Sequence, residues 1–104
     1  MTLNCPFPAG AGRKEILGAF QEQLIAAAED VKPDLVLISA GFDSRADDPL
    51  GRFLLTDTDF ADLTRVMREI ADKHAGGRVL SVLEGGYSLT GLASGLRAHV
   101  EALQ

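Results

Sequence analysis

The chain has 104 residues, the size of one domain or of one piece of a larger domain. Its composition, 46% hydrophobic and 24% charged, excludes a disordered or fibrous protein. The net charge of −5 opposes binding to nucleic acid or anionic lipid, and no apolar run could cross a bilayer or act as a secretion signal; we therefore expect a cytoplasmic protein with neither partner.

The chain is expected to begin with an irregular lead-in followed by a helix. Residues 2–12 carry two prolines and two glycines, and Cys5, the only cysteine, is expected to be an inert thiol because no neighbour would activate it. From Lys14 to Val31 apolar side chains recur at helical spacing, and Pro33 ends the predicted helix.

Two short apolar runs are predicted to be parallel strands joined through a helix. Residues 35–38 and 79–83 are apolar at nearly every position, which is typical of strands covered on both faces by helices. The intervening helix is expected to begin with a capping box formed by Thr56 and Asp59 and to end at Gly76-Gly77. The sequence thus predicts an α/β fold with a right-handed βαβ unit at its centre.

The last predicted helix leads to an argument about how complete the sheet is. Its apolar stripe consists of Leu89, Leu92, Leu96, Val100 and Leu103. Gly91 and Gly95 lower its intrinsic helix propensity, so we expect close packing against a neighbouring backbone. A sheet of two strands leaves each strand with an unpaired edge. Either the chain self-associates through these edges, or residues 1–104 are the carboxyl-terminal portion of a single larger α/β domain; we favour the second interpretation.

Polar residues follow both predicted strands, at the rim where parallel sheets bind ligands. Asp43 comes directly after Gly41-Phe42, where its carboxylate could be a metal ligand or a base; the alternative is a residue that caps the following loop or helix. Tyr87 follows Gly85 and Gly86, and its phenol could donate a hydrogen bond to an oxygen that gains negative charge; the alternative is a ring packed beside the sheet.

Asp48 has the same two alternatives as Asp43, because Asp-Pro commonly starts a turn. The two histidines are expected to be structural. His74 suits the dipole at the end of its helix, and His99 lies beside an apolar stripe position; neither has a metal-ligand spacing. A further hypothesis is a small nucleotide-binding protein that uses the Gly85-Gly86 turn and the start of the following helix as an anion site.

Three segments taken together resemble one enzyme family. Residues 33–43 (PDLVLISAGFD), 48–51 (DPLG) and 83–89 (LEGGYSL) are similar, in order and separation, to the carboxyl-terminal half of zinc-dependent histone deacetylases, in the version of the class II enzymes and their bacterial relatives, including acetylpolyamine amidohydrolases. The resemblance implies that the parallel-sheet βαβ unit is a segment of the open three-layer arginase/deacetylase fold.

The resemblance also implies roles for single residues. Asp43 is similar to the second aspartate ligand of the catalytic Zn2+, and Tyr87 to the tyrosine that hydrogen-bonds the substrate carbonyl. Leu50 resembles the apolar residue that lines the acyl-lysine channel, and Gly85 and Gly86 match the glycine-rich loop of another channel wall. In that family the zinc ion polarises the amide carbonyl and activates the attacking water.

The rest of the family's site has no counterpart in this sequence. The family's Asp-x-His ligand pair and its two tandem histidines lie upstream of the region that this sequence matches, so the zinc ligand set is incomplete. The resemblance implies a zinc-dependent deacetylase of acetyl-lysine or of an acetylpolyamine, present as a fragment that is inactive alone and could pair with the missing upstream segment. The alternative is a non-enzymatic assembly module that associates through exposed strand edges.

Overall fold

The computed structural model describes all residues from 1 to 104 and contains helices and one small sheet. The first helical stretch is continuous through α1 (Arg13–Ala19), a π-helical turn η1 (Phe20–Leu24) and α2 (Ile25–Val31). The remaining elements are β1 (Val36–Ala40), a 3-10 turn η2 (Phe42–Ser44), α3 (Asp57–His74), β2 (Val79–Leu83) and α4 (Leu89–Leu103). The predicted order of elements is confirmed, although β1 runs two residues beyond its predicted end.

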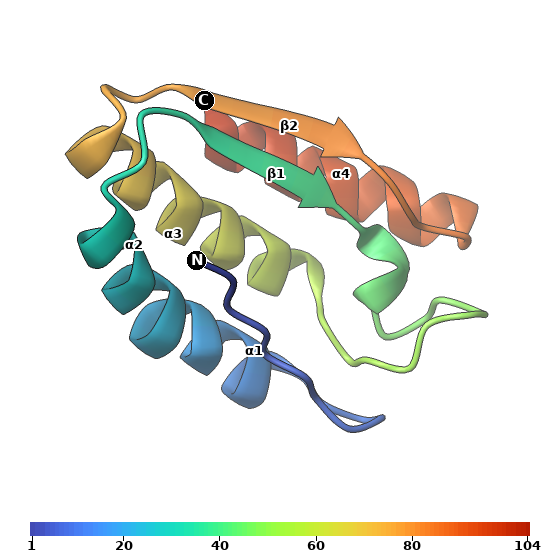
Figure 1. Ribbon diagram of the computed structural model, residues 1–104. Helices are drawn as coiled ribbons and strands as arrows, with labels where there is room; N and C mark the ends of the chain where they lie inside the picture. The colour runs from blue at the N-terminus through green and yellow to red at the C-terminus, as the bar shows by residue number, and fades with distance from the viewer.

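The sheet is parallel, as predicted, and has two strands. Val36 pairs with Val79 and the register continues to Ala40 and Leu83. Figure 1 shows both strands pointing the same way, with α3 and α4 on one side of the sheet and the stretch from α1 to α2 on the outer side of α3. Both strands therefore end at the same edge.

One face of the sheet is covered and the other is bare. On the covered face Val36 is buried and Ile38 is half-buried, whereas on the opposite face Leu37 and Leu80 are 64% and 56% exposed. The prediction that both faces are covered is therefore wrong for this structure. The strands are apolar on both faces, but all four helical segments that could cover them lie on one side.

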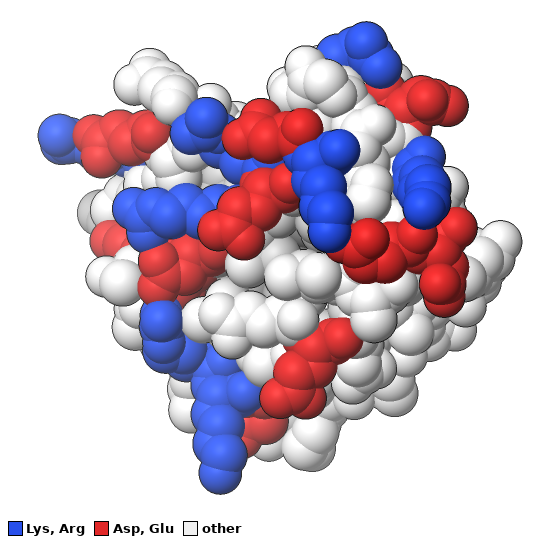
Figure 2. All heavy atoms as spheres, turned by 90° about the vertical axis from the view of Figure 1, so that its left-hand side faces the viewer, with Lys and Arg blue, Asp and Glu red and all other residues white.

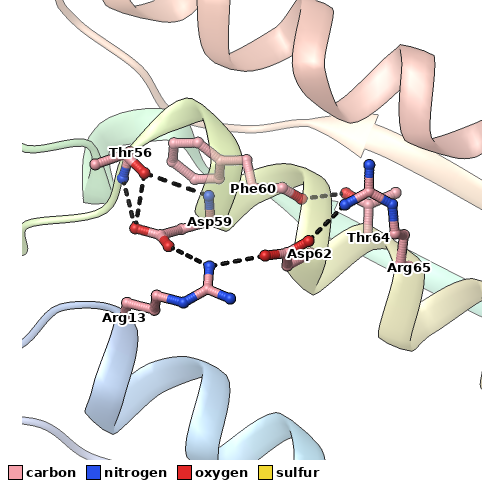
Figure 3. Close-up of polar contacts among 7 residues, drawn as sticks. All are labelled: Arg13, Thr56, Asp59, Phe60, Asp62, Thr64 and Arg65. Atoms are coloured by element: carbon pink, nitrogen blue, oxygen red, sulfur yellow. Dashed lines mark hydrogen bonds and ion pairs between the residues drawn. The ribbon is translucent and has the colours of Figure 1, made fainter.

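The start of α3 is fixed by a cluster of charges. Thr56 and Asp59 form the predicted capping box: the Thr56 backbone N–H donates to Asp59 Oδ2 over 2.9 Å. Figure 3 shows that Arg13, at the start of α1, reaches both Asp59 and Asp62. Burial alone would raise the pKa of the Asp59 carboxyl, but the hydrogen bonds from Arg13 and Thr56 outweigh it and hold that pKa below its usual range. The cluster thus joins α1 to α3.

The buried side of α4 differs from the predicted stripe. Gly91, Gly95, His99 and Ala102 are its buried residues, while Leu89 and Val100 of the predicted stripe are exposed. Gly95 is closely packed, but the expectation of a neighbouring backbone is wrong, because the neighbours are side chains: a Cβ there would lie 3.1 Å from Phe42 and 3.4 Å from Phe60. Glycines face inward at this part of α4 because larger side chains would collide with these two rings.

His99 is a structural bridge in the core. Its Nδ1 lies 2.7 Å from Thr64 Oγ1 on α3, and its Nε2 lies 2.8 Å from Ser81 Oγ on β2. Burial lowers the pKa of the His99 imidazole below its ordinary value. His74 lies within 3.7 Å of Glu29, so it joins the end of α3 to α2. The structural roles expected of both histidines agree with these contacts.

The end of the molecule away from the strand-end loops carries charges of both signs. Figure 2 shows basic and acidic side chains intermixed on this side rather than a continuous basic stripe. Lys73 on α3, for example, pairs with Glu29 on α2. None of the helices is both long enough and apolar enough for a bilayer crossing.

Candidate functional site

The two strand-end loops that carry the candidate residues meet at one edge of the sheet. The Phe42 backbone N–H, just after β1, donates to the Gly85 carbonyl, just after β2, over 2.8 Å. Both loops and the long connection from residue 45 to residue 56 lie at the end where the strand arrowheads point in Figure 1. The expectation that Asp43 and Tyr87 share one rim therefore agrees with the fold.

Asp43 lies in η2 and is enclosed by glycines. A Cβ on Gly85 would lie 2.8 Å from Asp43 Cγ and Oδ2, and a Cβ on Gly51 would lie 1.6 Å from the Asp43 carbonyl oxygen. Only glycine permits these approaches. The neighbouring Ser44 hydroxyl donates to the Gly41 carbonyl rather than to the Asp43 carboxylate. The carboxylate of Asp43 is therefore held in place by packing against backbone and not by a cap hydrogen bond.

The Asp48 carboxylate accepts hydrogen bonds from backbone N–H groups of two segments. Its Oδ1 accepts from Leu50 N over 2.8 Å and from Gly51 N over 2.9 Å, and its Oδ2 accepts from Tyr87 N over 2.8 Å. Partial burial would raise the pKa of the Asp48 carboxyl, but these hydrogen bonds and one from the Ser88 backbone hold it below its usual range. The turn expected at Asp48 is present, and it is tied to the loop after β2.

Tyr87 and Leu50 have exposed side chains beside this junction. The Tyr87 side chain is 53% exposed and Leu50 is 68% exposed. Ser88 caps α4 by accepting a hydrogen bond from Gly91 N over 3.2 Å. Gly86, with a φ of +140°, has a backbone conformation that favours glycine, and a Cβ there would meet Leu92 at 2.8 Å. The shared role of Asp43 and Tyr87 stays a prediction.

A half-buried arginine, Arg45, anchors the connection between β1 and α3. Arg45 Nε lies 2.8 Å from Asp57 Oδ1, and its Nη1 lies 2.7 Å from Asp47 Oδ2. Ser94 of α4 donates to the same Asp57 oxygen over 3.0 Å. Hydrogen bonds from Arg45 lower the pKa of the Asp57 carboxyl and raise that of the guanidinium itself. The connection that carries Asp48 and Leu50 is thereby fixed to α3 and α4.

The residues of this chain do not form a metal site by themselves. No group of three or more His, Cys, Asp or Glu side chains lies close enough to hold an ion. A catalytic zinc ion ordinarily has three protein ligands and one open position. Asp43 has the right chemistry for one ligand, so the donor set fits zinc only in part.

An apolar cavity lies beneath the loop after β1. It has a volume of about 200 Å³ and lies on the covered side of β1. Its lining includes Phe42, Phe53 and His99. It reaches Gly41 and Ser44 at the two ends of η2, but it includes neither Asp43 nor Tyr87. The candidate residues therefore lie at the loops and not inside this cavity.

Sequence reasoning missed the part that Asp48 plays in linking the two loops. The Asp-Pro-Leu-Gly spacing could have indicated the hydrogen bonds to Leu50 and Gly51, because an aspartate commonly binds the backbone two residues ahead. Nothing in the spacing indicated Tyr87, which is 39 residues away. The Arg45–Asp57–Ser94 contacts likewise join positions with no sequence signal.

Comparison with known proteins gives one consistent family. Residues 1–103 match the family model of the histone deacetylase domain. Histone deacetylase 6 of Caenorhabditis elegans is 44% identical over 105 residues, which cover 100% of this chain and 11% of that protein. The human polyamine deacetylase HDAC10 is 42% identical over 103 residues, which cover 98% of this chain and 15% of that protein.

A solved structure agrees with the sequence comparisons. The histone deacetylase Clr3 matches with a TM-score of 0.88 and 37% identity, over 98% of this chain and 17% of the Clr3 chain. The fold is thus the α/β arginase/deacetylase fold, as expected. The chain spans between about a tenth and a sixth of the length of these three proteins. Because the family model covers almost every residue, the chain belongs to the histone deacetylase family.

Proposed function

We propose that this chain is part of a zinc-dependent deacetylase that removes the acetyl group from an acetylated amine, either acetyl-lysine or an acetylpolyamine. The observation that carries the proposal is the arrangement at the sheet edge. The carboxylate of Asp43 is packed against Gly85 and does not cap a helix or turn. Tyr87 lies two residues after Gly85 on the same loop. The relatives' names, histone deacetylase and polyamine deacetylase, support both substrate classes.

In this proposal Tyr87 acts on the acyl oxygen of the substrate. Its hydroxyl donates a hydrogen bond to the oxygen, which gains negative charge as the carbonyl carbon is attacked. Leu50, exposed beside Tyr87, and the backbone at Gly85 and Gly86 would line the approach of the acyl chain. Asp43 would contribute one carboxylate ligand to the zinc ion.

The remaining ligands and the general base would come from residues that this sequence does not contain. We therefore expect residues 1–104 alone to bind zinc weakly and to leave acetylated amines intact. Equilibrium dialysis of the purified chain against zinc measures the first property, and an acetyl-lysine peptide assay measures the second. Stoichiometric tight zinc binding, or turnover by the chain alone, would contradict this assignment of the missing groups.

The decisive experiment uses the longest open reading frame that contains residues 1–104. The product is loaded with zinc and assayed on an acetyl-lysine peptide and an acetylpolyamine. Removal of one oxyanion donor typically lowers kcat by about a hundredfold or more, so Tyr87→Phe should have an effect of that size. Leu89→Ala is the matched control, because this side chain is nearby and 83% exposed. If Tyr87→Phe left kcat within about threefold of the wild type, the assigned role would be wrong.

A further inference from the structure

We propose that Asp48 is a positioning residue for Tyr87, acting through the backbone and not by contact with substrate. This inference rests on the proposed function, because it takes Tyr87 as the group that acts on the acyl oxygen. It concerns how the loop that carries Tyr87 is held against the turn that carries Leu50.

The two oxygens of the Asp48 carboxylate serve different segments. Oδ1 accepts from Leu50 N and Gly51 N and so closes the turn, whereas Oδ2 accepts from Tyr87 N on the loop after β2. Only a group with two acceptor oxygens can hold both segments at once. We call this set of contacts the Asp48 junction.

The Asp48 junction is a charge-assisted polar link between these loops. Four backbone N–H groups, including that of Ser88, lower the pKa of the Asp48 carboxyl, so it is charged at neutral pH. Hydrogen bonds to a charged acceptor are roughly twice as strong as those between neutral groups. The Tyr87 side chain is 53% exposed and receives little support from packing. Its position is therefore set mainly by its backbone.

The turn that contains Gly51 also lies against the backbone that carries Asp43. A Cβ on Gly51 would lie 1.6 Å from the Asp43 carbonyl oxygen, so the turn closed by Asp48 packs directly against η2. The Phe42 N–H to Gly85 carbonyl bond joins η2 to the loop after β2 independently of Asp48. Loss of Asp48 should thus release Tyr87 while leaving Asp43 in place.

Asp48→Asn separates the two halves of the junction with almost no change in shape. An asparagine has one acceptor oxygen and one NH2 group, so it can close the turn or accept from Tyr87 N, but not both. Asp48→Ser is a second variant: its hydroxyl can accept from the turn but is too short to reach Tyr87. Asp30→Asn is the matched control, since it makes the same charge change at an exposed position of α2, away from both loops.

The test is a double-mutant cycle in the zinc-loaded product of the longest reading frame. We expect Asp48→Asn to lower kcat about tenfold or more, with KM and bound zinc unchanged, and to have less than a threefold effect when Tyr87→Phe is already present. Asp30→Asn should leave kcat unchanged. If the losses from Asp48→Asn and Tyr87→Phe multiply, or if Asp48→Asn removes the zinc, Asp48 does not act through Tyr87 and the proposal is overturned.

Backbone amide exchange tests the junction without any activity. We expect the Tyr87 and Ser88 amides to exchange faster in Asp48→Asn and Asp48→Ser, while the amides of α3 keep their protection. Unchanged exchange at Tyr87 would overturn the proposal. A wild-type enzyme without deacetylase activity would instead contradict the proposed function, and the exchange measurement would still decide whether Asp48 holds the Tyr87 backbone.

Discussion

The two faces of the sheet carry similar apolar side chains, but one face is covered by helices and the other is exposed. Val36 and Leu37 are neighbours in β1, yet Val36 is 5% exposed and Leu37 is 64% exposed. On the covered face, Ser81 of β2 is hydrogen-bonded to His99, and β1 packs against α3. On the bare face, Leu80 and Val82 are more than half exposed. A strand that is apolar on both faces is thus suited to burial on both sides. It does not follow that helices of this chain cover both sides.

The sharpest way to break this comparison is to place a charge on each face in turn. Val36→Asp puts an unpaired carboxylate into the core, and we expect it to cost more than about 4 kcal/mol, enough to unfold a marginally stable domain. Leu37→Asp keeps its carboxylate in water and should cost no more than about 1 kcal/mol, mainly through strand propensity. Urea unfolding followed by circular dichroism measures both. Equal losses would mean that the bare face is covered in solution.

A smaller effect is expected when an apolar side chain is truncated on each side. Phe42 is 2% exposed and its ring lies 5.0 Å from that of Phe60, between centroids. Phe42→Ala should destabilise the chain by about 3 to 5 kcal/mol, because α3 and α4 cannot close the cavity completely. Leu80→Ala on the bare face should cost less than about 1 kcal/mol, since little area leaves water there. A similar cost for the two variants would contradict the difference in packing.

The covered face should also confer a dependence on pH. The folded-state pKa of His99 is lowered by burial, so between that pKa and about 6.5 the unfolded chain binds more protons than the folded chain. The contribution of neutral His99 is therefore complete above about pH 6.5 and is lost as the pH falls through this window. Unfolding free energies measured from pH 7.5 to 5 should decline, and His99→Gln should flatten this decline. An equally steep decline in the variant would assign it to other groups.

The smallest effect is expected on the outer side of α4, away from both the sheet and the core. Arg97 and Glu101 form an ion pair 2.8 Å long, with side chains that are 80% and 60% exposed. Water and salt screen such a pair. Arg97→Ala should leave the midpoint of urea unfolding unchanged within error, at both low and high salt. A clear shift at low salt alone would show that the pair contributes more than its exposure indicates.

Most of the fold could be predicted from local signals in the sequence. The capping box at Thr56, the Ser88 cap and the Gly76-Gly77 stop depend on residues within a few positions of one another, and all agree with the bounds of α3 and α4. The parallel pairing followed from two apolar runs separated by a helix. The shared rim of Asp43 and Tyr87 followed in turn, because parallel strands end at the same edge.

What the sequence by itself determined is the order of elements, their caps and the rim at which the candidate residues lie, because these depend on neighbours along the chain. The tertiary structure alone decided that His99 rather than Val100 faces inward, since Phe42 and Phe60 require the small residues of α4 beside them. It alone also decided that the carboxylate of Asp48 binds Tyr87 N, 39 residues away. Such contacts depend on how whole elements pack against each other, and the spacing of residues along the chain does not indicate this packing.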